Sequence, residues 1–210
     1  MSVFHNNALI GAGAGTGEVA AAEYVIPKSL RFNSSDSAYL SKTPSSAGNR
    51  RTWTWSGWVK RAKLGDDEAI FSGGASNPIT TIRFSGEGSA SPDGINIFHY
   101  AGSFSFQLTT TAQYRDLSSW YHIVVALDTT QATASNRLKL YVNGEQVTAF
   151  DTETYPSLNF EAEISNTSTQ TIARNGTGSN YKNGYLADIQ FVDGQALAPT
   201  DFGETRSSDG

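Results

Sequence analysis

The chain of 210 residues contains no cysteine, no long apolar run and no excess of basic residues. Without cysteine, disulfide bonds cannot contribute to stability, which must come from packing alone. No apolar stretch approaches the roughly 20 residues that a membrane helix needs, and the N-terminus lacks the basic start and apolar core of a secretory signal. The formal net charge of −5 argues against nucleic acid, which requires clustered Lys and Arg. We therefore expect no membrane insertion and no nucleic-acid partner.

Charged residues are also scarce, at 17%, and hydrophobic residues reach only 38%. Ser, Thr, Asn and Gly make up the difference, as on the surfaces of many extracellular β-proteins. A protein with such a surface, but with no secretory signal and no cysteine, suits a particle that is assembled inside a cell and released by lysis. A chain of this length commonly folds as one all-β domain.

Long amphipathic helices are missing, and alternation of period two takes their place in three segments: 52–60, 119–128 and 138–144. Such alternation sends side chains to opposite faces of a sheet. Three of the four tryptophans, Trp53, Trp55 and Trp58, lie in the first segment. Their regular spacing predicts that they pack in a hydrophobic core.

Short strands separated by Gly, Pro, Asn, Asp and Ser are predicted along the rest of the chain. They are expected near residues 29–32, 38–42, 52–61, 68–73, 80–85, 94–100, 103–110, 120–128, 137–142, 145–150, 169–175 and 184–193. Asn143-Gly144 predicts a type I′ hairpin turn, because both residues tolerate positive φ, and residues 197–202 predict a single helical turn. The pattern predicts an all-β fold, an antiparallel two-sheet jelly-roll sandwich.

Residues 1–27 differ from the remainder, because a tract of Gly and Ala over 11–17 offers almost no side chain to bury. The tract has neither phosphate-binding signature. We expect an extended arm, ordered by a partner surface on which its apolar residues dock: Phe4, Leu9, Ile10, Val25 and Ile26. The sandwich is expected over residues 28–203. Residues 204–210 are expected to be a tail that leads into further native sequence.

Five segments resemble the strands of laminin-G-like, concanavalin A-like lectin-glucanase domains. They are Leu30-Arg31-Phe32-Asn33 with Ser37-Ala38-Tyr39-Leu40, Thr54-Trp55-Ser56-Gly57-Trp58-Val59-Lys60, Trp120-Tyr121-His122-Ile123-Val124, Leu138-Lys139-Leu140-Tyr141-Val142-Asn143-Gly144-Glu145 and Gly184-Tyr185-Leu186-Ala187-Asp188-Ile189-Gln190-Phe191. Their order and spacing agree over residues 28–203. The resemblance implies a jelly roll that is able to carry lectin-like sites on its rim loops.

A narrower resemblance connects the chain with laminin-G-like domains of structural proteins of tailed bacteriophages, marine ones especially. It rests on Met1-Ser2-Val3-Phe4-His5-Asn6-Asn7 before the Gly/Ala tract, Val192-Asp193-Gly194-Gln195-Ala196-Leu197 and Asp201-Phe202-Gly203-Glu204. It implies a virion protein, either a capsid decoration or a component of a tail or head fibre. Its partners would be other virion subunits and host-surface glycans. It would be assembled in the host cytoplasm and function extracellularly.

Enzymatic chemistry has little support in the sequence. Glucanases of this superfamily use a Glu-x-Asp-x-x-Glu strand, whose two carboxylates flank the glycosidic bond. Asp151 with Glu153, and Glu161 with Glu163, each lack the third member. No Gly-x-Ser-x-Gly elbow is present, and His122 in mid-strand is better explained as a structural residue. We therefore expect no catalytic residues.

Sugar binding needs an aromatic platform together with amides or acids for the hydroxyl groups. Tyr100, Tyr114, Tyr155 and Tyr181 fall in or beside loops rich in Gly, Ser and Asn, and the loop 175–183 looks most like a binding loop. The candidate glycan-binding residues are Tyr181, Asn175, Asn180, Tyr155 and Tyr114. The alternative for Tyr181 is that it covers a sheet edge.

Calcium is the cofactor that the resemblance implies for some domains of this kind, bound at one rim by carboxylates and carbonyls. The candidate ligands are isolated residues: Asp93, Asp128, Asn166 and Asp188. Turn formation is the alternative for each of them. No other cofactor is expected.

Two functions from different classes therefore remain open. The first is a non-enzymatic virion protein anchored by its N-terminal arm and displaying a lectin-like sandwich. The second is a stand-alone carbohydrate-binding or adhesion module. A glucanase-like hydrolase is nearly excluded by the missing carboxylate triad.

Overall fold

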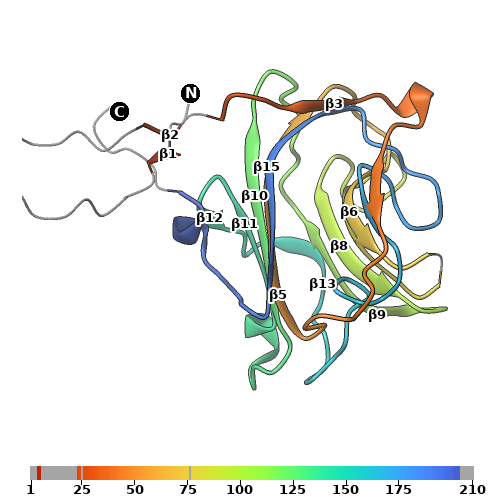
Figure 1. Cartoon of the computed structure of the whole chain (residues 1–210), viewed down its shortest axis with the longest axis vertical. Coiled ribbons are helices and arrows are strands. Elements are labelled where there is room, and N and C mark those ends of the chain that lie inside the picture. Colours follow the sequence, from red (N-terminus) through yellow and green to blue (C-terminus); the bar gives the residue numbers. More distant parts are fainter. Residues whose placement is uncertain (1–3, 6–22, 25, 76, 204–210) are drawn as a thin grey trace, which may run out of the picture.

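Two antiparallel β-sheets pack face to face in the computed structural model, which describes residues 4–5, 23–24, 26–75 and 77–203 (Figure 1). The antiparallel two-sheet sandwich predicted from the sequence is confirmed. The helices among the described residues are three short 3₁₀ turns: η1 (Ser34–Asp36), η2 (Ala134–Asn136) and η3 (Pro199–Asp201). None of them is long or apolar enough to cross a membrane.

The first sheet has six strands in the order β12-β11-β10-β5-β15-β3. Their bounds are β12 (Glu145–Gln146), β11 (Leu138–Val142), β10 (Tyr121–Asp128), β5 (Thr52–Arg61), β15 (Gly184–Asp193) and β3 (Leu30–Phe32). The long strands β5 and β15 share a register interrupted by a bulge between Ala187 and Gln190. β15, the last strand among the described residues, thus lies in the interior of this sheet.

The second sheet has seven strands in the order β13-β9-β8-β7-β6-β14-β4. Their bounds are β13 (Phe150–Thr154), β9 (Phe104–Thr110), β8 (Ile95–Tyr100), β7 (Ile79–Phe84), β6 (Glu68–Gly73), β14 (Gln170–Ile172) and β4 (Leu40–Lys42). Strands β6 to β9 follow one another as a meander, so most of this sheet is built from neighbours in sequence.

The expected N-terminal arm falls largely on positions outside the described residues, including Leu9 and Val25. Two of its short segments, β1 (Phe4–His5) and β2 (Glu23–Tyr24), pair with each other as a separate two-stranded ladder. Ile26 is half-buried. The expectation that a partner orders this arm stays a prediction, as does the tail at 204–210.

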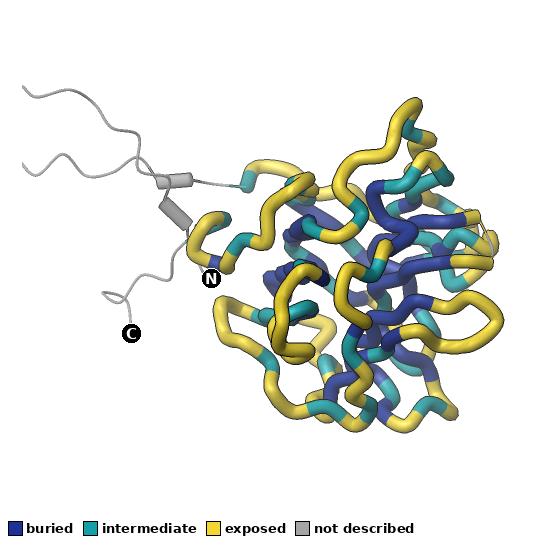
Figure 2. The backbone as a smooth tube through the Cα atoms, turned by 90° about the horizontal axis from the view of Figure 1, so that it is seen from below, coloured by how far each residue is buried: buried dark blue, intermediate teal, exposed yellow. Residues whose placement is uncertain are grey.

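The hydrophobic core fills the space between the two sheets, and Figure 2 shows the buried residues gathered there. Trp53 and Trp55 on β5 are fully buried in it, as is Ile123 on the neighbouring strand β10. The prediction of core packing is confirmed for these tryptophans but wrong for Trp58. Trp58 is half-buried on the opposite face of β5, where its ring stacks on His122.

The predicted turns are confirmed where the residue types favour one backbone conformation. Asn143 and Gly144 have φ values of 53° and 87°, as a type I′ hairpin requires, and η3 lies within the helical turn expected at 197–202. The single strand expected at 145–150 is wrong, because β12 ends at Gln146 and the chain crosses to the other sheet before β13 begins at Phe150.

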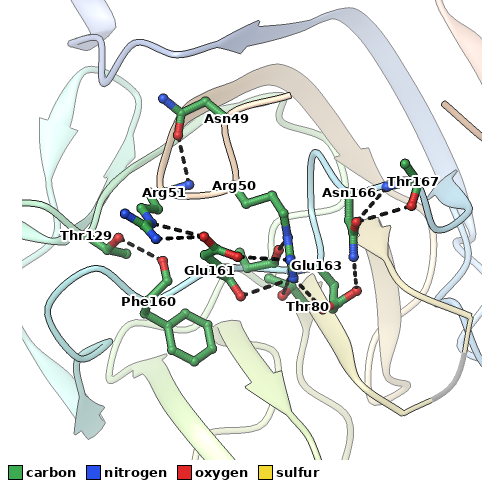
Figure 3. Close-up of polar contacts among 11 residues, drawn as sticks. Asn49, Arg50, Arg51, Thr80, Thr129, Phe160, Glu161, Glu163, Asn166 and Thr167 are labelled. Carbon is green, nitrogen blue, oxygen red and sulfur yellow. Dashed lines mark hydrogen bonds and ion pairs between the residues drawn. The ribbon is translucent and has the colours of Figure 1, made fainter. Parts of the chain in front are cut away.

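One end of the sandwich is closed by the loop between β13 and β14, which Arg50 holds in place (Figure 3). Arg50 donates from Nη2 to Glu163 (2.8 Å), from Nη1 to Glu161 (3.2 Å) and from Nε to the carbonyl of Ala162 (2.8 Å). Ala162 and Ile164 are thereby inserted between the sheets with no exposed surface. Glu161 and Glu163 therefore have a structural role: their ion pairs with Arg50 hold this loop against the end of the sandwich.

Candidate functional site

Three aromatic side chains form a cluster on the outer face of the seven-stranded sheet. Ile97 of β8 faces the core, so its strand neighbour Phe98 and then Tyr100 point outward. Phe104, at the start of β9, packs on both of them, with centroid distances of 5.6 Å to Phe98 and 5.2 Å to Tyr100. Phe104 is 51% exposed and Tyr100 36%, whereas Phe98 is buried at 8%. Phe98 therefore forms the floor of this aromatic cluster and the other two rings present accessible faces.

Polar groups surround the cluster on the same face. The guanidinium carbon of Arg83 lies 5.0 Å from the centroid of the Phe98 ring, and its charge is already matched by Asp67 at 2.7 Å. Gln107 pairs with Phe98 across β8 and β9, and Thr154 of β13 pairs with Gln107. Neither Gln107 nor Thr154 makes a side-chain hydrogen bond to another described residue. The cluster thus combines ring faces with a free amide and a free hydroxyl.

The loop that precedes β15 covers the part of this face next to the cluster. The backbone N–H of Gly176 donates to Ser72 Oγ at 3.3 Å, and Ser72, Thr81 and Phe98 are successive neighbours across β6, β7 and β8. A Cβ on Gly176 would lie 1.7 Å from the carbonyl oxygen of Gly74, so only glycine permits this approach. The loop singled out in the sequence and the aromatic cluster therefore lie side by side.

Three of the predicted glycan-binding residues belong to this loop. Asn175 is buried, and its Oδ1 accepts from Thr177 Oγ1 (2.6 Å) and from the N–H of Ser179 (3.0 Å), so it shapes the loop. Asn180 has a φ of 56°, and its carbonyl accepts from the N–H of a β6 residue. Tyr181 is half-buried and meets the edge of Tyr39 at 6.3 Å. Tyr181 is the member of the three that offers a partly accessible ring, but its aromatic partner Tyr39 precedes β4, at the edge of the sheet away from β8 and β9.

The other two predicted residues, Tyr114 and Tyr155, are not brought to this loop. Tyr114 packs against the core on Phe84 and Tyr121, and burial raises its pKa to about 12. Tyr155 donates its hydroxyl to Glu153 at 2.8 Å, and burial and that carboxylate raise its pKa to about 12. Both tyrosines are held by the protein itself, so their rings are occupied by packing.

Asp93, a predicted calcium ligand, has its charge balanced by arginine instead. It is buried at 2% exposure, and its Oδ1 lies 2.9 Å from Arg61 Nη2 and accepts from the N–H of Gly65 at 2.9 Å. Arg115 approaches the other oxygen at 3.4 Å. This carboxylate is therefore part of a salt-bridge network.

The remaining predicted calcium ligands do not gather around one point. Asp128 caps a turn by accepting hydrogen bonds from Thr130 and Gln131. Asn166 donates to Glu163 and accepts from the backbone N–H of the next residue. Asp188 lies in the bulge of β15, with a φ of 46°. Among the described residues, no group of three or more His, Asp or Glu side chains is arranged to hold a metal ion.

A buried ionic cluster, which the sequence did not indicate, joins β5, β6 and the loop before β15. Glu68 accepts from Lys182 Nζ at 3.0 Å, from Arg61 Nε at 3.4 Å and from the N–H of Asn183 at 2.9 Å. All three charged side chains are at most 1% exposed. Burial lowers the pKa of Lys182 to about 8, against the opposing effect of Glu68. The cluster is inaccessible to a ligand and links the two sheets.

Ser56 and His122 form a hydrogen-bonded pair on the outer face of the six-stranded sheet, with Ser56 Oγ 2.9 Å from His122 Nε2. Both are buried, at 1% and 3% exposure, and the His122 ring stacks on Trp58 with centroids 5.0 Å apart. Burial lowers the pKa of His122 to about 4, although the charge of Asp188 acts in the opposite direction. Because a substrate cannot reach either side chain, the pair serves to fix the Trp58 ring.

A shallow groove of about 360 Å³ lies further along the same outer face. It is bordered by Ala126, Lys139 and Tyr141 on the sheet and by the segment 196–198 above them. Its volume is at the lower end of the range for small-ligand sites. With one aromatic ring at its border, it is a poorer sugar platform than the aromatic cluster.

Solved structures of similar fold include several domains with carbohydrate-related titles. Domain 4 of the arabinanase AbnA from Geobacillus stearothermophilus, solved with arabinotriose, matches with a TM-score of 0.54 and 15% identity over 97% of this chain and 87% of that one. The CBM40 of the Ruminococcus gnavus IT-sialidase matches at 0.51 and 13% over 77% and 95%. A heptameric SAP-like pentraxin of Limulus polyphemus matches at 0.52 and 19% over 78% and 72%. At these identities the likeness extends to the fold alone.

A family model covers most of the sandwich, from residue 32 to residue 201. No curated protein sequence matches the chain. The family match coincides with the two sheets, from the end of β3 to η3. The chain belongs to the concanavalin A-like lectin/glucanases superfamily, in its Laminin_G_3 branch.

Proposed function

We propose that this domain is a non-enzymatic glycan-binding module whose aromatic cluster holds the apolar face of a sugar ring. The observation that carries the proposal is the exposure of Phe104 and Tyr100, at 51% and 36%, over a buried Phe98. Sugar rings have apolar faces and polar edges, and aromatic side chains stack on the former. The free amide of Gln107 and hydroxyl of Thr154 stand where they can meet ring hydroxyls.

Two further observations support binding without catalysis. Two acidic side chains beside the cluster are already engaged: Asp67 pairs with Arg83, which lies over the Phe98 ring, and Glu153, next to Thr154, accepts from Tyr155. Glycoside hydrolysis requires a pair of carboxyl groups free to flank the bond. The structural likeness to a domain solved with arabinotriose and to a sialidase CBM40 supports a glycan as the ligand.

A glycan array probed with the full chain tests the proposal, followed by calorimetric titration of the best ligand. Phe104→Ala should weaken binding by about 1–2 kcal/mol, roughly five- to thirty-fold in Kd, because it removes a ring at the centre of the contact. Leu158→Ala is the matched control, since Leu158 is 53% exposed outside the cluster. Wild-type affinity in both Phe104→Ala and Tyr100→Ala, or no glycan bound at all, would overturn the proposal.

The finer proposal is that the module is displayed on the virion of a tailed phage, as a capsid decoration or a fibre component. The resemblance of residues 1–7, 192–197 and 201–204 to phage structural proteins supports it. Weak single sites repeated on a particle would gain avidity. Deletion of residues 2–27 should abolish incorporation into the particle and leave glycan binding unchanged. Normal incorporation of the deletion variant would refute anchoring by the arm.

A further inference from the structure

A row of alternating cationic and aromatic side chains crosses the outer face of the six-stranded sheet. Arg31 of β3 pairs with Tyr185 of β15, and Tyr185 pairs with Lys60 of β5. Trp120 lies beside Lys60, one position beyond the last register pair of β10 with β5. Cross-strand neighbours share a face, and β10, β5, β15 and β3 are consecutive strands of the six-stranded sheet. We call this set the cation–aromatic row.

The charges of the row are unmatched by the described part of the chain. Neither Arg31 nor Lys60 forms an ion pair with another described residue, whereas Arg61, one position from Lys60, is buried against Glu68 and Asp93. Arg31 is exposed and Lys60 is half-buried. The carboxylate of Asp188 lies further along β15 and acts electrostatically on His122. The row therefore presents two cations with no carboxylate between them.

The aromatic members of the row are held in place by packing. The rings of Trp120 and Tyr185 meet at a centroid distance of 6.4 Å across the strand that carries Lys60. Trp58, two positions along β5, adds a third ring, which is fixed by stacking on His122. All three aromatic residues are half-buried, so each keeps part of its ring surface accessible. Ring surface that is already ordered loses little entropy on binding.

We propose that the cation–aromatic row binds an acidic polysaccharide, with ring faces stacked on Trp120 and Tyr185 and sugar carboxylates paired with Lys60 and Arg31. Arg31 and Lys60 stand two strand spacings apart, about 10 Å, so they meet successive charges of an extended chain that crosses the strands. Arginine and lysine both bind carboxylates through charge-assisted hydrogen bonds. This site is on the opposite sheet from the aromatic cluster and has a different chemistry.

Polygalacturonate, a linear chain of sugar carboxylates, is the probe, and its highly methyl-esterified form is the uncharged control. The full chain should bind polygalacturonate and not the ester, and binding should weaken between about 0.1 M and 1 M salt, as the screening length falls from about 10 to 3 Å. Lys60→Gln should raise the Kd about tenfold through loss of a charge-assisted contact. Lys42→Gln, on exposed β4 of the other sheet, is the matched control and should leave the Kd unchanged.

Trp120→Ala provides the second variant and should raise the Kd about tenfold, with the melting temperature recorded to verify folding. Phe104→Ala should leave polygalacturonate binding intact, so this proposal and the proposed function fail separately. Equal binding of the ester, or an unchanged Kd in both Lys60→Gln and Trp120→Ala, would overturn the row as the site. Equally tight binding of single-stranded oligothymidylate would overturn the assignment to acidic sugars.

Discussion

Glu68→Gln tests whether the buried ionic cluster holds the sandwich together. The substitution keeps the shape of the side chain and an oxygen that accepts from the N–H of Asn183. It removes the negative charge that faces Lys182 at 3.0 Å and Arg61 at 3.4 Å. Asp93 is then the remaining buried acid of the cluster, and it contacts Arg61 but not Lys182. Lys182 therefore loses its acidic partner. We expect a less stable protein with an unchanged fold.

The magnitude follows from how each cation responds. Lys182 escapes by losing its proton, and because its pKa is already about 8, neutralising it at pH 7 costs about 1.4 kcal/mol. Arg61 stays charged and loses one charge-assisted hydrogen bond, which costs about 1.5 kcal/mol or somewhat more. The free energy of unfolding should fall by about 3 kcal/mol. For a domain of this size the melting temperature should drop by about 6–12 °C.

Urea denaturation at pH 7, followed by tryptophan fluorescence, measures the change. The double variant Glu68→Gln/Lys182→Met should be more stable than Glu68→Gln alone, because the second substitution removes the cation left without a partner. A loss below about 1 kcal/mol in Glu68→Gln would refute the reasoning, since even the proton loss from Lys182 would then be missing. A double variant less stable than the single one would refute it as well.

Other substitutions test the core, the pH response and the end loop. Trp55→Ala should lower the free energy of unfolding by about 3–5 kcal/mol, because Trp55 is fully buried in the core. Trp58 is half-buried on the outer face, so Trp58→Ala should lower it by only about 1–2 kcal/mol in the same urea titration. Equal losses would contradict the assignment of the two tryptophans to different faces. Between about pH 8 and pH 10 the free energy of unfolding of wild type should rise relative to that of Lys182→Met. In that range the unfolded chain keeps the Lys182 proton that the folded protein has released, so wild-type stability gains on the variant; a constant difference would count against a lowered pKa. Arg50→Ala should release the loop before β14, and limited proteolysis should then cut that loop faster than in wild type; an unchanged cleavage rate would exclude this role.

Strands with strong local patterns could be predicted from the sequence to the residue. β5, β6 and β15 have the expected bounds, because apolar alternation and flanking turn residues agree there. β13 could not be predicted, since Phe150–Thr154 alternates acids with threonines and shows no apolar face. Its pairing with β9 makes it a strand, and that contact is not visible in the local sequence.

The aromatic cluster illustrates why the candidate site was only partly foreseen. The sequence marks Tyr100 as a loop tyrosine, but Phe98 and Phe104 have the pattern of core residues within apolar strands. The strand Ile95–Tyr100 carries apolar side chains on both faces, with His99 on the inner one, so alternation alone does not say which rings face solvent. The register with β7 and β9 decides it, and register depends on the whole sheet.

The buried ionic cluster and the outward position of Trp58 were missed for related reasons. Lys182 and Glu68 are 114 positions apart in the sequence, and a lone lysine among loop residues gives no sign that it will be buried. Trp58 differs from Trp55 by an odd number of positions, so strict alternation already placed them on different faces. That signal was present in the sequence and was outweighed by the general tendency of tryptophan to be buried.

The interior position of β15 in the six-stranded sheet has a consequence for synthesis on the ribosome. Until residues 184–193 have left the exit tunnel, one edge of β5 has no partner, and the strand that carries Trp53 and Trp55 can pair with other chains. The seven-stranded sheet is able to assemble its meander earlier, from β6 to β9. A delay before residues 184–193 emerge would therefore favour aggregation, and a chaperone that shields β5 would raise the yield of native protein.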